Sequence, residues 1–242
     1  YDAEGTLSPD GKKMIYTSDK DGDIDLYIMD LKTGKEKRVT NTLGYDGGAW
    51  FSPDGTKIIW RASRPKTETE IKEYKELLRE NLVAPTNMEV FVANADGSDP
   101  HQVTKYGQAN WAPSFMPDSK RIIYQSTRDG RECDQQYVMN ADGSNVHLVS
   151  TGKGVTTCGY FLADNKHIVY ASTHEGGASC PARPDRSKGY VWAVYPTFDI
   201  FLAEDNGKII KKLTDTPGYD AEATVNWKTN RIIYTSKASG DL

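Results

Sequence analysis

A segment that recurs five times constrains the fold of this chain more than any other feature of its sequence. The segment starts as a turn and continues as an aliphatic and aromatic run: residues 8–18 read SPDGKKMIYTS, and residues 52–62 read SPDGTKIIWRA. The same frame returns at residues 116–126, 162–172 and 226–236, so that successive copies are offset by 44, 64, 46 and 64 residues. The chain is therefore built from a unit of about 44 residues, which carries about twenty extra residues in two copies.

Each unit is expected to form four short antiparallel strands. The first strand precedes the turn, as at residues 49–51, and the second is the Ile-Ile-Tyr run. The third and fourth strands flank a glycine turn such as Thr33-Gly34, where glycine supplies the positive φ of a tight hairpin. Four-stranded antiparallel units of this length, repeated four or more times, predict an all-β fold, the β-propeller.

The repeat boundaries predict a single propeller domain over residues 1–242. Its full blades are residues 1–44, 45–107, 108–153 and 154–218, a partial blade covers 219–242, and insertions at 63–87 and 173–192 lengthen the second and fourth blades. The fifth unit stops before its third strand. We expect a ring of six to eight blades, or one completed by another segment or chain; the alternative is that the missing parts are disordered.

The repeat resembles a known family. The turn and strand of residues 8–18, followed by Asp-Leu-Tyr-Ile-Met-Asp at residues 25–30, look like the PD40 (WD40-like) repeat of TolB-type propellers. The resemblance covers the chain apart from the two insertions, and it implies a periplasmic or secreted location. Units four and five depart from it at residues 163–165 and 227–229, where Pro-Asp-Gly is lost, so we expect those turns to differ in shape.

Composition excludes two classes of partner. No apolar run approaches the ~18 residues that a membrane span needs, so the chain is not expected to cross a membrane. Thirty basic and thirty-four acidic side chains are interspersed and give a net charge of −4, which lacks the basic footprint of a nucleic-acid binder. Three cysteines are too few for a disulfide scaffold.

Both insertions fall between the second and third strands of a unit, which places them on one face of a propeller, where functional loops gather. In the first, Thr67 and Glu70 form a capping-box pattern before an apolar stripe that includes Tyr74 and Leu78. This pattern predicts a helix. Two readings are open: the stripe packs on its own blade, or it binds a partner.

The second insertion is rich in glycine, proline and basic residues, which predicts an irregular loop. Cys180 lies in this loop and Cys158 in the first strand of the same blade, so we expect a Cys158–Cys180 disulfide that ties the loop down. Free thiols are the alternative, and Cys133 is a competing partner. A disulfide would indicate an oxidising compartment.

A Tyr-Asp pair occupies one register in three units, at residues 1–2, 45–46 and 219–220. With the neighbouring glutamates, these aspartates predict a partial rim of carboxylates at the mouth of the channel, able to hold Ca²⁺ or a cationic segment of a partner. The alternative is that each aspartate binds amides of its own linker. The candidate partner- or ligand-binding residues are Asp2, Glu4, Tyr45, Asp46, Tyr74, Leu78, Asn110, Trp111, His174, Tyr219, Asp220 and Glu222, and the calcium candidates are Asp2, Asp46 and Asp220.

Catalytic signatures are missing from the sequence. It contains no Gly-x-Ser-x-Gly elbow, phosphate loop or His-Glu-x-x-His motif, so no enzymatic activity and no cofactor other than the candidate calcium are expected. The leading hypothesis is a non-enzymatic exported propeller that binds a protein or peptide through the loop face and channel mouth. The alternatives are an accessory or substrate-gating propeller of a larger peptidase or lyase, and an architectural subunit of an envelope or extracellular assembly, joined through the incomplete fifth blade.

Overall fold

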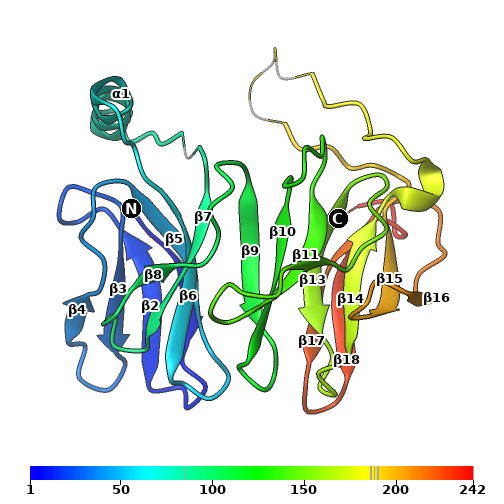
Figure 1. The fold of residues 1–242 in the computed structure, drawn as a ribbon, viewed down its shortest axis with the longest axis horizontal. Coiled ribbons are helices and arrows are strands. Elements are labelled where there is room, and N and C mark those ends of the chain that lie inside the picture. The colour runs from blue at the N-terminus through cyan, green and yellow to red at the C-terminus, as the bar shows by residue number, and fades with distance from the viewer. Residues whose placement is uncertain (85, 186, 188, 190, 242) are drawn as a thin grey trace. The chain divides into compact units, whose positions relative to one another are not determined.

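The computed structural model describes residues 1–84, 86–185, 187, 189 and 191–241 (Figure 1). Positions 186, 188 and 190 of the second insertion lie outside this description. The chain divides into two compact units. The first comprises Tyr1–Ile122 and Asn140–Ser144, and the second comprises Ile123–Met139 and Asn145–Leu242. Among the described residues, no helix combines the length and the apolar character that a membrane crossing requires.

The strands group into five sheets. The first sheet holds β1 (Asp2–Leu7), β2 (Lys13–Ser18), β3 (Asp25–Asp30) and β4 (Glu36–Arg38), and the second holds β5 (Tyr45–Phe51), β6 (Lys57–Ser63), β7 (Glu89–Asn94) and β8 (His101–Gln102), with α1 (Glu68–Arg79) between β6 and β7. The third holds β9 (Asn110–Phe115), β10 (Arg121–Ser126), β11 (Gln135–Asn140) and β12 (His147–Leu148). The fourth holds β13 (Thr156–Phe161), β14 (His167–Ser172), β15 (Asp199–Glu204) and β16 (Ile209–Lys212), with η1 (His174–Gly176) after β14, and the fifth holds β17 (Asp220–Asn226) and β18 (Arg231–Ser236).

The strand order confirms the predicted all-β propeller fold. In each four-stranded sheet the strands lie side by side in the order of the sequence. In the first, second and fourth sheets every neighbouring pair is antiparallel. Such sheets are the unit that a propeller repeats.

The second strand of each full repeat lies in the core. Ile15, Ile59, Ile123 and Val169 occupy one register position and are completely buried. Strand β18 carries the Ile-Ile-Tyr run too, but among the described residues it pairs only with β17, and Ile233, at the same register position, is 75% exposed.

The turn between the first and second strands has the same form in four repeats. Asn165, at the position of Gly11, adopts φ +58° and its amide donates to the Leu162 carbonyl at 3.1 Å, just as the Gly11 amide donates to Ser8 at 2.8 Å. Asparagine tolerates this left-handed conformation, so the expected change of shape in the fourth repeat is wrong. In the fifth repeat the left-handed residue is Asn230, one position later, and there the turn does differ.

The first strand of every sheet carries a left-handed residue at one register position. The five residues are Glu4, Gly48, Ala112, Cys158 and Glu222, with φ between +44° and +61°. In four sheets the pairing with the second strand shifts at this point. We call this feature the first-strand bulge, and the sequence repeat did not predict it.

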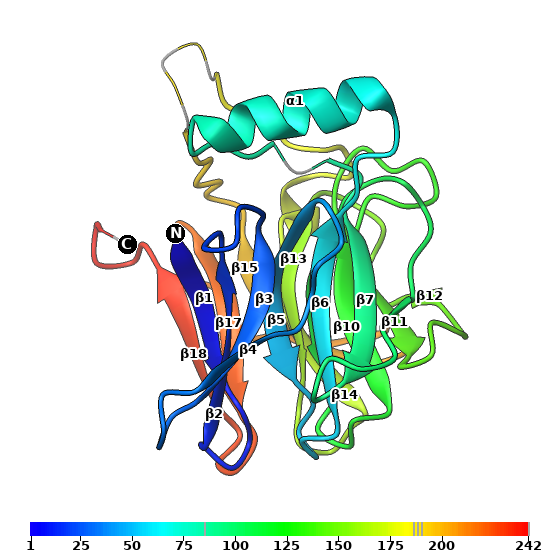
Figure 2. The same ribbon diagram turned by 90° about the vertical axis from the view of Figure 1, so that its left-hand side faces the viewer.

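The predicted helix is present as α1. The Thr67 side chain accepts from the Glu70 amide at 3.2 Å, and the Glu70 carboxylate accepts from the Thr67 amide at 2.9 Å, which confirms the capping box. The helix lies across one end of the strands of the first unit (Figure 2). None of its residues is buried.

Candidate functional site

The Tyr-Asp pair at the start of β5 lies inside the first unit. Asp46 is completely buried, and its Oδ1 accepts from Trp60 Nε1 at 2.6 Å and from Arg64 Nη2 at 2.5 Å. Burial raises the pKa of the Asp46 carboxyl to about 6, against the opposing effect of the Arg64 charge. Asp46 therefore anchors Arg64, at the beginning of the first insertion, and does not contribute to an exposed carboxylate rim.

Glu4 gathers a second polar cluster at the first-strand bulge of β1. Its carboxylate accepts from Arg61 Nη2 at 2.6 Å, from the Gly48 amide at 2.8 Å, and from the Tyr45 and Thr17 hydroxyls at 3.2 Å each. The cluster ties β1 to β5 and β6. Two of the residues predicted from the sequence, Glu4 and Tyr45, are therefore in contact. Asp2, in the same strand as Glu4, is exposed.

Arg61 is a site residue that the sequence reasoning missed. Its guanidinium lies 5.9 Å from the ring centroids of both Tyr45 and Trp111, within reach of a cation–π interaction. The repeat alignment could have identified it, because the four other repeats have an uncharged residue at this position: Thr17, Gln125, Ala171 and Thr235. A cation at one copy of a repeated position marks a local departure from the common frame.

Asn110 is the first residue of β9 and occupies the repeat position of Asp46. Its Nδ2 donates to the Met88 carbonyl at 2.8 Å and to Glu89 Oε2 at 3.2 Å, and the side chain is completely buried. The neighbouring Trp111 is half-buried and packs with Leu78 against the buried cluster formed by Ile24, Tyr45 and Met88. Asn110 is thus an internal structural residue, and Trp111 borders the base of α1.

Two predicted helix residues face the body of the first unit. The Tyr74 hydroxyl donates to Asp23 Oδ1 at 2.6 Å, and the same carboxylate accepts from the Ile24 amide at 2.9 Å and the Gly44 amide at 3.1 Å. Burial raises the pKa of Tyr74. With Leu78 packed on the cluster beneath, part of the predicted stripe therefore contacts its own unit. Leu82, after the helix end, is 53% exposed.

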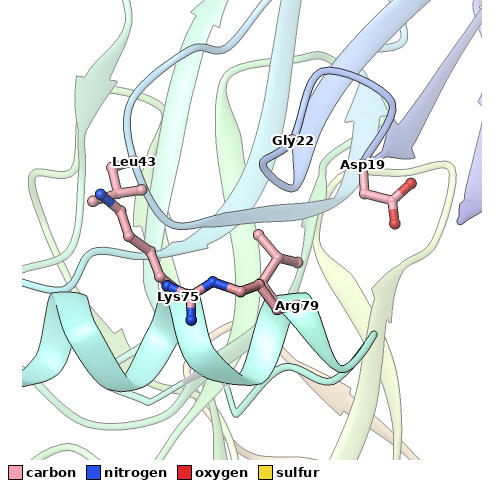
Figure 3. A pocket seen from close by; sticks show the side chains of 6 residues that line it. Asp19, Gly22, Leu43, Lys75 and Arg79 are labelled. Atoms are coloured by element: carbon pink, nitrogen blue, oxygen red, sulfur yellow. The ribbon is translucent and has the colours of Figure 1, made fainter.

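A cleft of about 380 Å³ lies beside α1, and we call it the α1 cleft. It is lined by Asp19, Gly22, Leu43, Lys75, Leu78 and Arg79 (Figure 3). Leu43 and Leu78 give it apolar surface, and Lys75 and Arg79 give it positive charge. Within the part of the chain that the structure describes, neither cation forms a salt bridge. The sequence reasoning found Leu78 but not the two cations.

In the second unit, His174 is held as a packed ring. Its centroid lies 4.4 Å from that of Phe201, its Nδ1 lies 3.0 Å from the Ser172 hydroxyl, and burial lowers the pKa of the imidazole. Beside it, Lys212 Nζ forms salt bridges with Glu175 and Asp199, each at 2.9 Å. These contacts fasten the start of the second insertion to β15 and β16.

The disulfide of the second unit differs from the predicted one. Cys180 is bonded to Cys133, with the two Cα atoms 5.8 Å apart, and Cys158 is a free thiol. The Cys158–Cys180 prediction is therefore wrong. Cys158 occupies the first-strand bulge of β13, and its Sγ lies 3.3 Å from the Thr157 hydroxyl. Cys133, in the loop between β10 and β11, is the cysteine that reaches the inserted loop.

The third Tyr-Asp pair, at residues 219–220, is also internal. Tyr219 packs edge-on against Phe198 with centroids 5.6 Å apart, and Asp220 accepts from the Thr216 hydroxyl at 2.7 Å. Both side chains are buried, whereas Glu222 is exposed and accepts from the Thr235 hydroxyl at 3.1 Å. Burial thus removes Asp220, like Asp46, from the expected rim.

The donor groups that metal binding requires are dispersed. The described residues include no cluster of three or more histidine, cysteine, aspartate or glutamate side chains that could hold a metal ion. Asp2 is exposed. Asp46 and Asp220 are buried, and their carboxylates accept hydrogen bonds from Arg64 and Thr216, respectively. Calcium binding by these three residues stays a prediction.

Comparisons with known proteins support the propeller fold and include a likeness to TolB. No protein-family model matches the chain. The Tol-Pal system protein TolB of Francisella tularensis is 28% identical over 156 residues, which cover 52% of this chain and 36% of that protein. The chain spans about a third of the length of the curated relatives it matches.

Solved structures extend the comparison to nearly the whole chain. TolB from Acinetobacter baumannii is 22% identical with a TM-score of 0.60, and the alignment covers 89% of this chain and 44% of the TolB chain. A putative TolB from Agrobacterium tumefaciens is 17% identical with a TM-score of 0.67, and the alignment covers 96% of this chain and 68% of that TolB chain. Peptidases are also among the structures with a similar fold, so the fold alone does not decide the activity. The repeats, the strand order and these comparisons together identify the chain as a β-propeller that is similar to TolB.

Proposed function

We propose that this chain is part of a non-enzymatic, exported propeller that binds a protein or peptide partner through the loops that follow the second strand of its sheets. The observation that carries the proposal is α1, which is fixed by side-chain hydrogen bonds although none of its residues is buried. A helix that served only the core would bury its apolar stripe fully, whereas the four apolar residues of α1 are only half-buried: Ile71, Tyr74, Leu77 and Leu78. A helix that is fixed and still accessible is suited to contact another molecule.

The exposed apolar residues around the insertion support this proposal. Leu82 is 53% exposed and Val83 is 36% exposed, and they lie three and four residues after the end of α1 at Arg79. In the second unit, Trp192 at the end of the other insertion is 68% exposed. Large apolar side chains in such positions are the anchors that binding surfaces use.

The titratable groups of the site support binding rather than catalysis. Glu4 is occupied by Arg61 and Tyr45, and Asp46 is occupied by Arg64. His174 packs against an aromatic ring, and burial lowers its pKa. A catalytic acid or base needs an atom within reach of the substrate, and these groups instead hold the structure together.

An exported location is supported by the disulfide and by the relatives. Cys133 and Cys180 come from different loops of the second unit, and disulfides of this kind persist in oxidising compartments. The resemblance to TolB implies the same location.

Removal of the helical insertion tests the proposal. Residues 66–83 are replaced with a short Gly-Ser linker, and the proteins captured from envelope extract of the source organism are identified by mass spectrometry. The control is Lys32→Gln, in the exposed turn between β3 and β4, and circular dichroism verifies that the β signal is kept. We expect the deletion to lose captured proteins that the control retains. Capture of the same proteins in equal amounts would remove α1 from the function.

A further inference from the structure

We infer that the α1 cleft binds an acidic peptide segment, in which a glutamate or aspartate carboxylate lies next to an aliphatic side chain. The inference rests on the proposed function and assigns a chemistry to the partner. It concerns the cleft of about 380 Å³ in the first unit, which Figure 3 shows from close by.

The charges of α1 are sorted between two sides of the helix. Lys75 and Arg79, one helical turn apart, line the α1 cleft. The glutamates Glu70 and Glu73 line a different pocket, beside Arg64 and Tyr74. The helix therefore has no general basic character, and two of its three cations line the cleft, whereas Lys72 does not.

The two cations are available to a ligand. Among the described residues of α1, the intrahelical salt bridge joins Lys72 and Glu76 at 3.9 Å and includes neither Lys75 nor Arg79. The Lys75 side chain extends from the helix toward Leu43 (Figure 3). An arginine fork binds a carboxylate through two parallel hydrogen bonds, and a nearby lysine adds a further charge.

The remaining lining residues restrict the ligand to a particular kind of anion. Leu43 and Leu78 offer apolar surface for an aliphatic side chain. Asp19 also lines the cleft, but its carboxylate is paired with the N-terminal amino group of Tyr1 at 2.8 Å, so Lys75 and Arg79 dominate the charge that a ligand meets. A carboxylate followed by an aliphatic side chain matches this lining, because the carboxylate reaches the cations and the side chain covers the leucines.

The cleft is held open by contacts of its own walls. Tyr74, on the helix, donates to Asp23, which belongs to the same loop as Asp19 and Gly22. That loop is closed by the Gly22 amide, which donates to the Asp19 carbonyl at 2.9 Å. A ligand therefore meets a preformed site and does not have to order it, which reduces the entropic cost of binding.

Fluorescence anisotropy with labelled ten-residue peptides tests the inference on the full protein. The probe contains Glu-Leu at its centre, and the two comparison peptides contain Gln-Leu and Glu-Ser. Arg79→Gln and Lys75→Gln remove the cations one at a time. Lys72→Gln is the matched control, because it removes a cation of the same helix that does not line the cleft.

We expect the Glu-Leu peptide to bind about threefold to tenfold more tightly than either comparison peptide, with the advantage decreasing as salt increases. Arg79→Gln and Lys75→Gln should each weaken binding by a similar factor, and Lys72→Gln should leave it unchanged. Equal binding of all three peptides, absence of binding, or equal effects of the three substitutions would overturn the inference.

The partner-capture experiment separates this inference from the proposed function. If replacement of residues 66–83 abolishes capture while Arg79→Gln and Lys75→Gln keep it, the proposed function stands and the cleft is not the recognition element. If the deletion leaves capture unchanged, the proposed function fails whether or not the peptide binds the cleft.

Discussion

The Cys133–Cys180 bond supports a quantitative prediction about stability. The two cysteines are separated by 47 residues, and closing a loop of this length removes entropy from the unfolded chain that corresponds to about 4 kcal/mol at 25 °C. For a chain of this size, each kcal/mol changes the midpoint of thermal unfolding by about 2–4 °C. Cys180→Ser should therefore lower the midpoint of thermal unfolding by up to about 8–16 °C.

The assay is thermal unfolding followed by circular dichroism, with and without a thiol reductant. Reductant should lower the midpoint of the parent protein to that of Cys180→Ser and leave the variant unchanged. Cys158→Ser is the matched control, because it removes the free thiol and should retain the sensitivity to reductant. Peptide mapping under non-reducing conditions should find residues 133 and 180 in one linked fragment. A linked fragment that contains Cys158, or a midpoint lowered only by Cys158→Ser, would refute the reasoning.

Three further predictions concern the anchors of the first insertion. Burial raises the pKa of Asp46 to about 6, so the native form binds a proton at a higher pH than the unfolded chain does. As pH falls from about 7 to 4, the parent protein should therefore gain about 2 kcal/mol of stability relative to Asp46→Asn, measured by urea unfolding across that range. Thr67→Ala should destabilise α1 by about 1 kcal/mol and speed amide exchange within the helix alone. Tyr74→Phe leaves Asp23 with one donor fewer and should also speed exchange in α1, whereas unchanged exchange would contradict its role as an anchor.

The repeat is what made the fold predictable. Residues 8–18 and their four copies define strand, turn and strand in a fixed register, and short-range turn chemistry then selects the antiparallel pairing. Even the substituted turn at Asn165 follows the frame, because asparagine accepts the conformation of glycine. The capping box of α1 was predictable for the same reason, since Thr67 and Glu70 are only three residues apart.

The candidate site was harder to predict because it depends on contacts between distant residues. The repeat gave the register of Asp46, but its burial depends on Trp60 and Arg64, of which Trp60 replaces the tyrosine of the other repeats and adds an indole donor. Likewise, the pairing of Cys180 depends on the path of two irregular loops, which no local pattern encodes.

The first-strand bulge has a consequence for how this repeat can change. The left-handed backbone is kept whether the position holds glutamate, glycine, alanine or cysteine, so the path of the chain there is imposed by the surrounding sheet. Four of these positions carry a side chain on the left-handed backbone, at a conformational cost of about 1–2 kcal/mol each. At Gly48 a Cβ would lie 2.8 Å from Arg61 Nη1, so the Arg61 guanidinium that binds Glu4 requires glycine there. The bulge thus gives the repeat a position whose side chain can differ from copy to copy, as the ion pair of Glu4 and the free thiol of Cys158 illustrate.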